Sequence, residues 1–449
     1  MRIGLVVHGQ PPELVGGTER LVEMLATSLC ERGDQVEVFT GSIEWRDRFE
    51  VVREEGGLFP VTRVHRHDLF FERWDKVENP LVEQAYGAWL DGFRPDVVHI
   101  HHWVRLTTTL VRVARQRGIP TIVSLHDLFP SCPRYHRVKE DLSFCEDTPG
   151  VDVCRHCAPR WSFQGDSEID ASILEFTKNL SEEVMAASAR VVPTMGHGRR
   201  LQEWLGLEFP VTAIAPPASC GVTPASMPLE DRVASAEDPM RVAFFGHLHP
   251  LKGPSVFLQA CQLLDDRSLV ELHFWGEAPT DAMEEELQKE ADGCAVHWHG
   301  SYVPEDLSDA PVDVVVLSTL CAESYSLALD EAGCMTVPIL ASDLGALSDR
   351  ATDRMALFPR GDAAALAQLL SALASDPGRR RTMRESPVAT QQGNKTHLEE
   401  LTKLYEQVCG NPPEAVIMED RLEQRIHAFE SREASLREQG PAHESDHPS

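Results

Sequence analysis

The sequence predicts an α/β protein built from two doubly wound domains that face each other across a cleft. Three observations support this fold class. The first half alternates short β-branched runs with helical patterns, residues 218–239 interrupt that pattern with Pro, Ser, Gly and acidic residues, and the alternation then restarts. A chain of 449 residues is long enough to bury a separate core in each half.

The first domain is predicted over residues 1–217. Helical patterns separate most of its apolar runs, and the one at 18–33 ends in Gly33, a residue typical of the position just after a helix. Such alternation favours a parallel sheet covered by helices. The predicted strands are 2–7, 35–40, 61–66, 96–102, 121–127, 190–194 and 211–216.

The second domain is predicted over residues 240–390, after a linker at 218–239. Its expected strands are 241–246, 269–276, 295–300, 312–319, 337–342 and 356–359. Further helical stretches follow at 362–375 and 395–409. The tail at 411–449 carries apolar residues at short-helix spacing among many charges, which fits either a short coiled coil or a helix packed on the core with a polar end. These apolar residues are Met418, Leu422, Ile426, Phe429 and Leu436.

The composition excludes several classes of partner. Asp and Glu total 71 against 42 Lys and Arg, so the formal net charge is −29, which argues against nucleic acid as a partner and against docking to an anionic membrane. No apolar run approaches the ~20 residues that span a bilayer, and the N-terminus predicts a first strand instead of a signal peptide. The sequence therefore predicts a cytoplasmic protein.

Two carboxylates in the second half form the first candidate site. Glu323 follows the predicted strand 312–319 at a point where a helix can begin, and Glu331 stands eight positions later. Ligands of doubly wound sheets bind beyond the carboxyl ends of the strands, and a helix N-terminus favours phosphate. Eight positions on a helix are a little over two turns, so Glu323 and Glu331 are expected to lie on roughly one face.

Three further loops follow predicted strands. Gly16 and Gly17 open the first helix, where paired glycines allow close backbone approach to a phosphate, although such a pair is also a common turn. Lys252 precedes a helix and could be a plain surface lysine. His126 ends a buried strand, where histidine is often structural; the neighbouring Asp127 could orient it or cap the next segment.

Four cysteines form a cluster outside these loops, within a long loop at 130–160. Cys154 and Cys157 have the spacing of half a zinc knuckle, and Cys132 and Cys145 could complete a tetrahedral site. Such a zinc would be structural, since it would order an irregular segment. The alternative is four unrelated thiols or a redox pair.

The segment 321–349, with Glu323, Glu331 and the following VPILASDLGAL, resembles the Glu-x7-Glu motif of retaining glycosyltransferases of family 4, which have the GT-B fold. The resemblance extends from residue 1 to about residue 408. It implies a nucleotide-diphosphate sugar as donor, no catalytic cofactor, and a small-molecule, lipid-linked or glycan acceptor, with peripheral membrane contact compatible with that chemistry. It also implies that a helix at 391–410 crosses back to the first domain.

The resemblance assigns roles to individual residues. Glu323 would hold hydroxyls of the transferred sugar, Glu331 the ribose, and Lys252 the diphosphate, while His247 stands where the family has an arginine. Ser324, Tyr325, Ser326 and Leu327 would complete the donor site. Gly16 and Gly17 would contact the pyrophosphate, and His126 the transferred sugar. The expected reaction is sugar transfer with retention of configuration, as in cell-envelope polysaccharide or glycoconjugate synthesis.

Two other functions remain open from the sequence. A nucleotide-sugar epimerase can share the same fold, but it would need acid and base groups around the nucleotide sugar without an acceptor site. A degenerate sugar-nucleotide-binding protein is the other, because His247 replaces an always-charged arginine. The sequence does not identify the donor base, the sugar, the acceptor or the oligomeric state.

Overall fold

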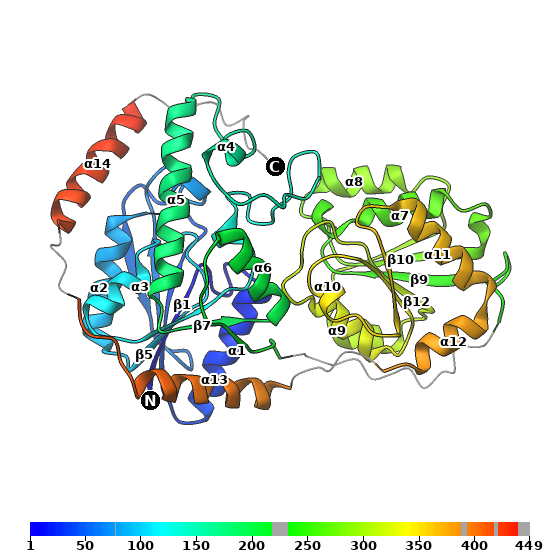
Figure 1. The fold of residues 1–449 in the computed structure, drawn as a ribbon, viewed down its shortest axis with the longest axis horizontal. Helices are drawn as coiled ribbons and strands as arrows, with labels where there is room; N and C mark the ends of the chain where they lie inside the picture. Colours follow the sequence, from blue (N-terminus) through cyan, green and yellow to red (C-terminus); the bar gives the residue numbers. More distant parts are fainter. Residues whose placement is uncertain (77, 218–231, 388–392, 417–420, 439–449) are drawn as a thin grey trace. The chain divides into compact units, whose positions relative to one another are not determined.

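The computed structural model describes residues 1–76, 78–217, 232–387, 393–416 and 421–438. The chain forms two compact units (Figure 1). The first comprises residues 1–135, 146–214 and 395–449, and the second comprises 136–145 and 215–394. Most of the predicted linker, at 218–231, and Met418 of the tail lie outside the described residues.

The first unit is built on an eight-stranded sheet in the order β3-β4-β2-β1-β5-β6-β7-β8, parallel except for the antiparallel pair β3–β4. The order changes direction between β1 and β5, which are the paired central strands. The strands are β1 (Arg2–Val7), β2 (Gln35–Gly41), β3 (Glu50–Glu54), β4 (Val61–His65), β5 (Val97–Ile100), β6 (Thr121–Ser124), β7 (Ala189–Val192) and β8 (Thr212–Ala213).

Helices from both ends of the chain cover one face of this sheet. Apolar residues of α1 (Gly17–Glu31) and α13 (Asn394–Cys409) share a buried cluster with β1, and Tyr405 of α13 donates or accepts a hydrogen bond at His99 of β5, 2.8 Å away. On the opposite face, α2 (Pro80–Phe93) packs so closely that a Cβ added to Gly4 would lie 2.6 Å from Trp89. The sheet is therefore buried on both faces.

The remaining helices of the first unit include the one predicted in the tail. α14 (Leu422–Glu438) lies against α2, where Arg425 pairs with Glu78 and Glu83, and Glu433 pairs with Lys76 (Figure 1). The tail therefore contains a helix packed on the core. The others are α3 (Leu110–Gln116), α4 (Val151–Cys154), α5 (Asp166–Ala186), α6 (Met195–Leu205) and the 3-10 turns η1 (Trp74–Lys76) and η2 (Phe129–Ser131).

The second unit has a six-stranded, fully parallel sheet in the order β11-β10-β9-β12-β13-β14. This is the doubly wound 3-2-1-4-5-6 order, which changes direction between β9 and β12. The strands are β9 (Met240–Phe245), β10 (Val270–Trp275), β11 (Val296–Gly300), β12 (Val314–Leu317), β13 (Ile339–Ser342) and β14 (Met355–Phe358).

Helices cover both faces of the second sheet. α7 (Pro254–Gln262), α8 (Asp281–Glu290) and α11 (Ala363–Ser375) share a buried cluster with one face, and α9 (Leu327–Cys334) and α10 (Ala346–Asp349) share another with the opposite face. α12 (Pro377–Glu385) and the turns η3 (Pro250–Lys252), η4 (Arg267–Leu269) and η5 (Pro304–Asp309) complete the unit. No helix in the described part of the chain is long and apolar enough to cross a membrane.

Candidate active site

A pocket of the second unit lies where the order of its strands changes direction. Residues from the ends of β9 and β12 line it, together with the loops that follow them. This is the place where doubly wound sheets bind ligands. The lining residues are Phe244, Phe245, Gly246, Lys252, Leu317, Ser318, Thr319, Glu323, Ser326, Ala328 and Leu347. Three of them, Lys252, Glu323 and Ser326, are predicted site residues.

Lys252 and Glu323 form an ion pair in this pocket. The Nζ of Lys252 lies 2.6 Å from Oε1 of Glu323, and the two side chains are 39% and 14% exposed. Burial acts to lower the pKa of Lys252, but the Glu323 carboxylate raises it above its usual value, so the ammonium keeps its proton at neutral pH. The pocket therefore holds a positive charge that is paired with a neighbouring carboxylate.

Backbone contacts fix the two loops that carry this pair. The hydroxyl of Ser318 donates to the carbonyl of Gly253 at 2.8 Å, and that of Thr319 donates to the carbonyl of Leu251 at 3.0 Å. Gly253 has φ +74°, and a Cβ there would lie 2.0 Å from the Ser318 oxygen. Only glycine allows this approach, so the sequence Lys252-Gly253 sets the position of the lysine.

α10 and Arg350, which directly follows it, hold the loop between β12 and α9 in place. The amide of Ala346 donates to the carbonyl of Glu323 at 2.8 Å, and Arg350 donates to the carbonyl of Tyr325 at 2.8 Å while its guanidinium lies 4.0 Å above the Tyr325 ring. Ser326 has φ +68°, an uncommon conformation for a serine, directly before α9 begins at Leu327. The first turn of α9 thus reaches the pocket through Ser326 and Ala328.

The expectation that Glu323 and Glu331 share one helix face is wrong. α9 begins at Leu327, so Glu323 lies in the preceding loop and only Glu331 lies on the helix. Burial raises the pKa of Glu331, and the hydroxyl of Tyr302, which donates to its Oε2 at 2.7 Å, partly offsets that effect. Tyr302, which comes from the loop after β11, was not among the predicted site residues.

The histidine in the arginine position is accessible. His247 is exposed and follows Gly246, which lines the pocket. The neighbouring His249 has a different environment: its Nδ1 accepts from the amide of Leu251 at 3.1 Å, and burial lowers its pKa. Of the two histidines in this loop, His249 is therefore held by a backbone contact, whereas His247 is exposed to solvent.

In the first unit, the paired glycines begin α1 beside a buried carboxylate. Gly16 precedes the helix in an extended conformation, and a Cβ there would lie 2.6 Å from Oε2 of Glu19. Glu19 is 3% exposed and pairs with Nε2 of His8 at 2.8 Å. Sequence reasoning missed this pair, although His8 directly follows β1 and Glu19 stands in the same GGTER segment as Gly16 and Gly17.

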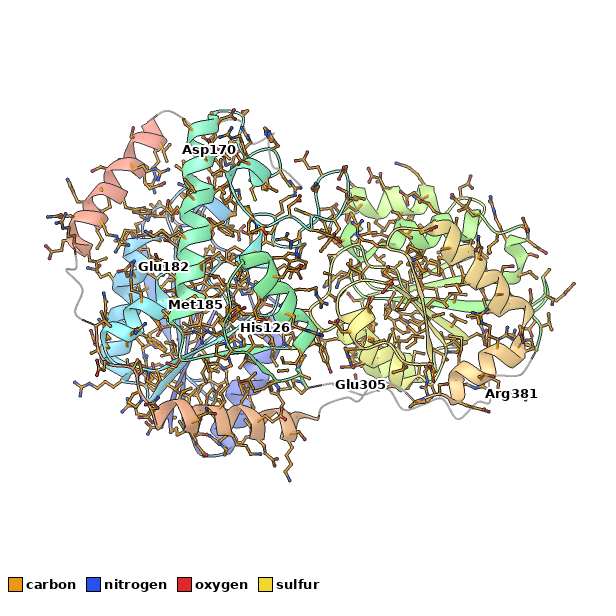
Figure 2. The ribbon with its side chains drawn as sticks, in the orientation of Figure 1. His126, Asp170, Glu182, Met185, Glu305 and Arg381 are labelled. Carbon is orange, nitrogen blue, oxygen red and sulfur yellow. The ribbon has the colours of Figure 1, made fainter. Side chains whose placement is uncertain are left out.

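His126, labelled in Figure 2, belongs to a cluster of imidazoles at the carboxyl edge of the first sheet. Its Nε2 lies 2.9 Å from Nδ1 of His101, and the two rings are nearly parallel, 5.2 Å apart. Desolvation lowers the pKa of His126 to about 3, although Asp127 opposes this shift. The ring is therefore neutral at pH 7, a form that can both donate and accept a hydrogen bond.

Asp127 has two contacts that bear on its role. Its Oδ1 accepts from the amide of Phe129 at 2.9 Å, which caps the short turn η2, and its Oδ2 lies 3.1 Å from Nε2 of His102. The rings of His102 and His8 are 4.5 Å apart. The imidazole cluster thus reaches the His8–Glu19 pair next to the glycine turn.

The cysteine loop contains thiols and turns of the kind found in zinc knuckles. Cys154 is buried, and Cys132, Cys145 and Cys157 are half-buried. The amide of Arg134 lies 3.4 Å from Sγ of Cys132, and the amide of Cys157 donates to the carbonyl of Cys154 at 3.0 Å. Cys145 belongs to the second unit and the other three to the first. The zinc site stays a prediction.

Both halves of the chain match known family models. Residues 15–146 match Glycosyltransferase Family 4, and residues 239–376 match Glycosyl transferases group 1. D-inositol 3-phosphate glycosyltransferase of Geodermatophilus obscurus is 26% identical over 383 residues, covering 78% of this chain and 76% of that protein. The enzyme of the same name from Arthrobacter sp. is 25% identical over 420 residues, covering 87% and 90%.

Solved structures share the fold across almost the whole chain. Sucrose-phosphate synthase from Thermosynechococcus elongatus has a TM-score of 0.63 at 19% identity and covers 91% of this chain and 99% of its own. The Anabaena protein HepE in complex with UDP and glucose has a TM-score of 0.55 at 14% identity and covers 96% and 100%. At such identities the likeness shows the fold and not the substrate.

Proposed function

Since this chain belongs to the retaining glycosyltransferases of family 4, has their GT-B fold and transfers a sugar from a nucleotide-diphosphate donor, we propose that the donor diphosphate binds at the pocket beyond β9 and β12. The observation that carries this proposal is the Lys252–Glu323 pair, 2.6 Å apart, in a pocket at the turning point of the strand order. A charged lysine and the first turn of a helix both favour phosphate oxygens at this place.

The ion pair suits a donor that carries charge at one end and hydroxyls at the other. When the diphosphate enters, the ammonium of Lys252 moves part of its interaction from Glu323 to a phosphate oxygen, and the carboxylate accepts hydrogen bonds from sugar hydroxyls. Charge that develops on the leaving phosphate during bond breaking is then stabilised by Lys252 and by the N–H groups at the start of α9. His247 provides a further imidazole beside Gly246 for the same phosphates.

The donor site extends along the loop and the helix in our proposal. Ser324, Tyr325, Ser326 and Leu327 present backbone groups to the donor, and Glu331 with Tyr302 holds the ribose. The Glu331 carboxylate already accepts one hydrogen bond from Tyr302, so its second oxygen is the acceptor for a ribose hydroxyl. Burial raises the pKa of Glu331 and so disfavours the carboxylate. A ribose hydroxyl that donates to this carboxylate would favour the ionised form and offset that effect.

In the first unit, Gly16, Gly17 and His126 serve the transferred sugar and the acceptor. The neutral ring of His126 is suited to hydrogen bonding with sugar hydroxyls, and not to charge neutralisation. The relatives are named for D-inositol 3-phosphate and the Thermosynechococcus structure for a sucrose phosphate, so we propose a hydroxyl-bearing acceptor of the sugar- or polyol-phosphate type. Lipid-linked and glycan acceptors are the alternatives to test. We also propose a cytoplasmic or membrane-peripheral location and a role in the synthesis of envelope glycoconjugates.

The deciding experiment pairs UDP-, GDP- and ADP-sugars with inositol, hexose and lipid-linked phosphates and follows nucleotide release and product. The expected result is acceptor-dependent release of nucleotide and, by NMR, a product with the anomeric configuration of the donor. Epimerised nucleotide sugar without acceptor would identify an epimerase. Donor binding without turnover across the panel would identify a binding protein and overturn the proposed catalytic roles.

We also propose a structural zinc held by Cys132, Cys145, Cys154 and Cys157. The amide that points at Sγ of Cys132 is the contact that stabilises a metal-bound thiolate, and the Cys154–Cys157 turn has the knuckle spacing. Zinc would order the loop that follows His126 and would take no part in bond breaking.

A further inference from the structure

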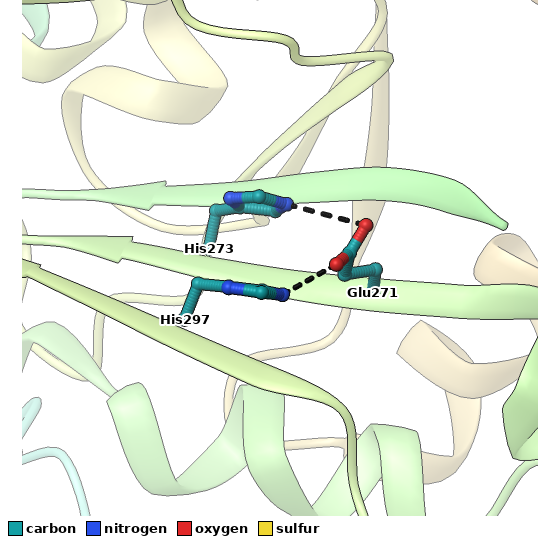
Figure 3. A group of neighbouring side chains, drawn as sticks. All are labelled: Glu271, His273 and His297. Carbon is teal, nitrogen blue, oxygen red and sulfur yellow. Dashed lines mark hydrogen bonds and ion pairs between the residues drawn. The ribbon is translucent and has the colours of Figure 1, made fainter.

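A second group of ligand-type side chains lies on the sheet of the second unit, away from the lining of the pocket. Glu271 and His273 are two positions apart on β10, so their side chains project from the same face. His297 of the parallel strand β11 is the direct register partner of His273. Figure 3 shows the three side chains converging from the two neighbouring strands.

The three side chains are close enough to share one ion. One ring nitrogen of His273, one of His297 and a carboxylate oxygen of Glu271 all lie within 4.8 Å of one another. His297 is hydrogen-bonded to Oε1 of Glu271, and Nε2 of His273 is 3.7 Å from Oε2. The two imidazoles are nearly parallel, at 15°, with centroids 4.8 Å apart.

The buried member of the group presents to the others a nitrogen that lies 3.7 Å from Glu271 but makes no hydrogen bond among the described residues. His273 is 6% exposed, and its Nε2 has no hydrogen-bond partner among the described residues. A buried polar atom without a partner is costly in a folded protein, which indicates that something else satisfies it. His297 is half exposed, so an ion can reach the group from solvent.

A third histidine orients the buried ring. Nδ1 of His273 lies 3.0 Å from Nε2 of His299, which stacks on Trp275 with centroids 4.0 Å apart. If Nδ1–H of His273 donates to His299, Nε2 carries the lone pair and is aimed at Glu271 and His297. Metal-binding histidines usually have such a contact on the other ring nitrogen.

We propose that Glu271, His273 and His297 bind one Zn²⁺ ion, with the fourth position open to water. Two imidazoles and one carboxylate form a donor set that zinc accepts, at about 2.0–2.2 Å from each ligand atom. A tetrahedral site places ligand atoms about 3.4 Å apart, so the half-exposed His297 needs only a small side-chain rotation. The negative charge of Glu271 offsets one charge of the ion.

A second group of similar composition makes a useful contrast. Glu13, Glu44 and His65 of the first unit also place their ligand atoms within 4.8 Å of one another. There, however, Arg63 lies 3.4 Å from Glu13 and Arg46 lies 2.8 Å from Glu44. An ion would have to displace or repel two guanidinium groups, so we assign the site to the second unit and use His65 as the control.

The position of the site gives it a structural effect. β11 is the edge strand of its sheet, and an ion held by β10 and β11 would tie that edge to the sheet. Both strands end next to each other, where the amide of Gly276 donates to the carbonyl of Gly300 at 2.8 Å. Gly276 in turn packs on Gly246, because a Cβ added to Gly276 would lie 1.9 Å from the carbonyl oxygen of Gly246. Zinc would thus stabilise the loop that borders the donor pocket.

The test is a titration of the metal-stripped full-length protein with Zn²⁺ by calorimetry, and with Co²⁺ by absorption. Cobalt bound to thiolates gives intense near-ultraviolet charge-transfer bands, whereas a His₂Glu site gives only weak visible bands. Metal bound by the cysteine loop can therefore be distinguished from metal bound by Glu271, His273 and His297. We expect one equivalent of metal without thiolate bands. His297→Gln should weaken its affinity roughly tenfold or more, and His65→Gln should leave it unchanged.

His297 is exposed, so His297→Gln should fold normally, and an unchanged melting temperature without metal checks this. Zinc should raise the melting temperature of the wild type more than that of His297→Gln. The proposal is overturned if the wild type binds no ion outside the thiols, if His297→Gln binds as tightly as the wild type, or if His65→Gln removes the equivalent instead. None of these outcomes depends on sugar transfer, so the proposed function is tested independently.

Discussion

The ammonium of Lys252 meets the carboxylate of Glu323 although 71 positions separate them in the chain. Each follows a central strand of the second sheet, and the two strands lie next to each other on either side of the point where the strand order changes direction. The pair therefore forms only when these two strands are neighbours in the folded sheet. Its two members can be tested one at a time.

Glu323→Gln should lower kcat/KM roughly 100-fold, in the range found for the loss of one transition-state contact. The amide keeps the size of the side chain but loses the charge that holds Lys252 and the acceptor strength needed by sugar hydroxyls. Steady-state kinetics with the donor identified in the panel measures the effect. The control is Glu285→Gln, an exposed carboxylate 3.9 Å from Lys289 on α8, which should behave as wild type. Normal turnover of Glu323→Gln would remove Glu323 from the mechanism.

Lys252→Ala should raise the Kd of the nucleotide diphosphate about tenfold or more, because one charge-assisted phosphate contact is lost. Its side chain is 39% exposed, so the melting temperature should change little. Calorimetry with the free nucleotide and with the nucleotide sugar gives both affinities. Lys289→Ala is the matched control, and an unchanged Kd for Lys252→Ala would show that the diphosphate binds elsewhere.

His247→Arg should preserve or tighten donor binding, since Arg carries its charge at every assay pH and can contact a phosphate through two N–H groups. Calorimetry with the nucleotide sugar, on the wild type and on this variant, checks the expectation. Loss of binding in this variant would mean that the loop no longer serves the diphosphate.

Acid should destabilise the first unit through its buried histidines. The pKa of His126 in the folded protein is about 3, below the ordinary 6.5, so the unfolded chain takes up the proton first as the pH falls. Stability contributed by the neutral ring is therefore present above pH 6.5 and is lost between about 6.5 and 3. His126→Gln should reduce the slope of unfolding free energy against pH in this window by up to about 1.4 kcal/mol per pH unit.

Urea unfolding at a series of pH values gives that slope. An identical slope for His126→Gln and wild type would show that His126 titrates as an ordinary histidine in the folded protein.

The cysteine loop should carry about one equivalent of zinc, in addition to the ion proposed at β10 and β11. Cys154→Ser should remove this equivalent and its thiolate bands with cobalt, while His297→Gln should keep it. Chelation should then expose the segment between His126 and Trp161 to proteolysis and reduce activity, and zinc should restore both. A zinc-free preparation with full activity would leave the four cysteines as packing residues.

The parallel strands could be predicted because their sequence signal is local. The runs expected at 2–7, 35–40 and 241–246 are observed as β1, β2 and β9, and the remaining predicted strands are confirmed with boundaries shifted at their ends. β3 was missed: Glu50–Glu54 has two adjacent valines flanked by charged residues and is mostly exposed at the sheet edge. An edge strand lacks the apolar run of a buried one.

The site residues followed less directly from the sequence. Lys252 and Glu323 could be singled out because each follows a strand, but their ion pair depends on which strands are neighbours. The same limit hid His101 beside His126 and Tyr302 beside Glu331. One signal was available: β5 and β6 are both followed by histidines, and neighbouring parallel strands end at the same edge. The start of α9 at Leu327 could not be read, because the positive φ of Ser326 depends on Arg350 and Gly345 holding the loop.

The cover of the first sheet by α13 has a consequence for biosynthesis. α1 leaves the ribosome before the second unit, but the helix beside it, with Leu401, Leu404 and Tyr405, is made only after the whole second unit. Until then the part of the apolar face of β1 and β2 that α13 covers stays uncovered by that helix. His99 also lacks the hydroxyl of Tyr405, which lies 2.8 Å from it in the folded protein. The second unit is continuous except for residues 136–145, so it can fold as it is translated, and the unit that is begun first is completed last.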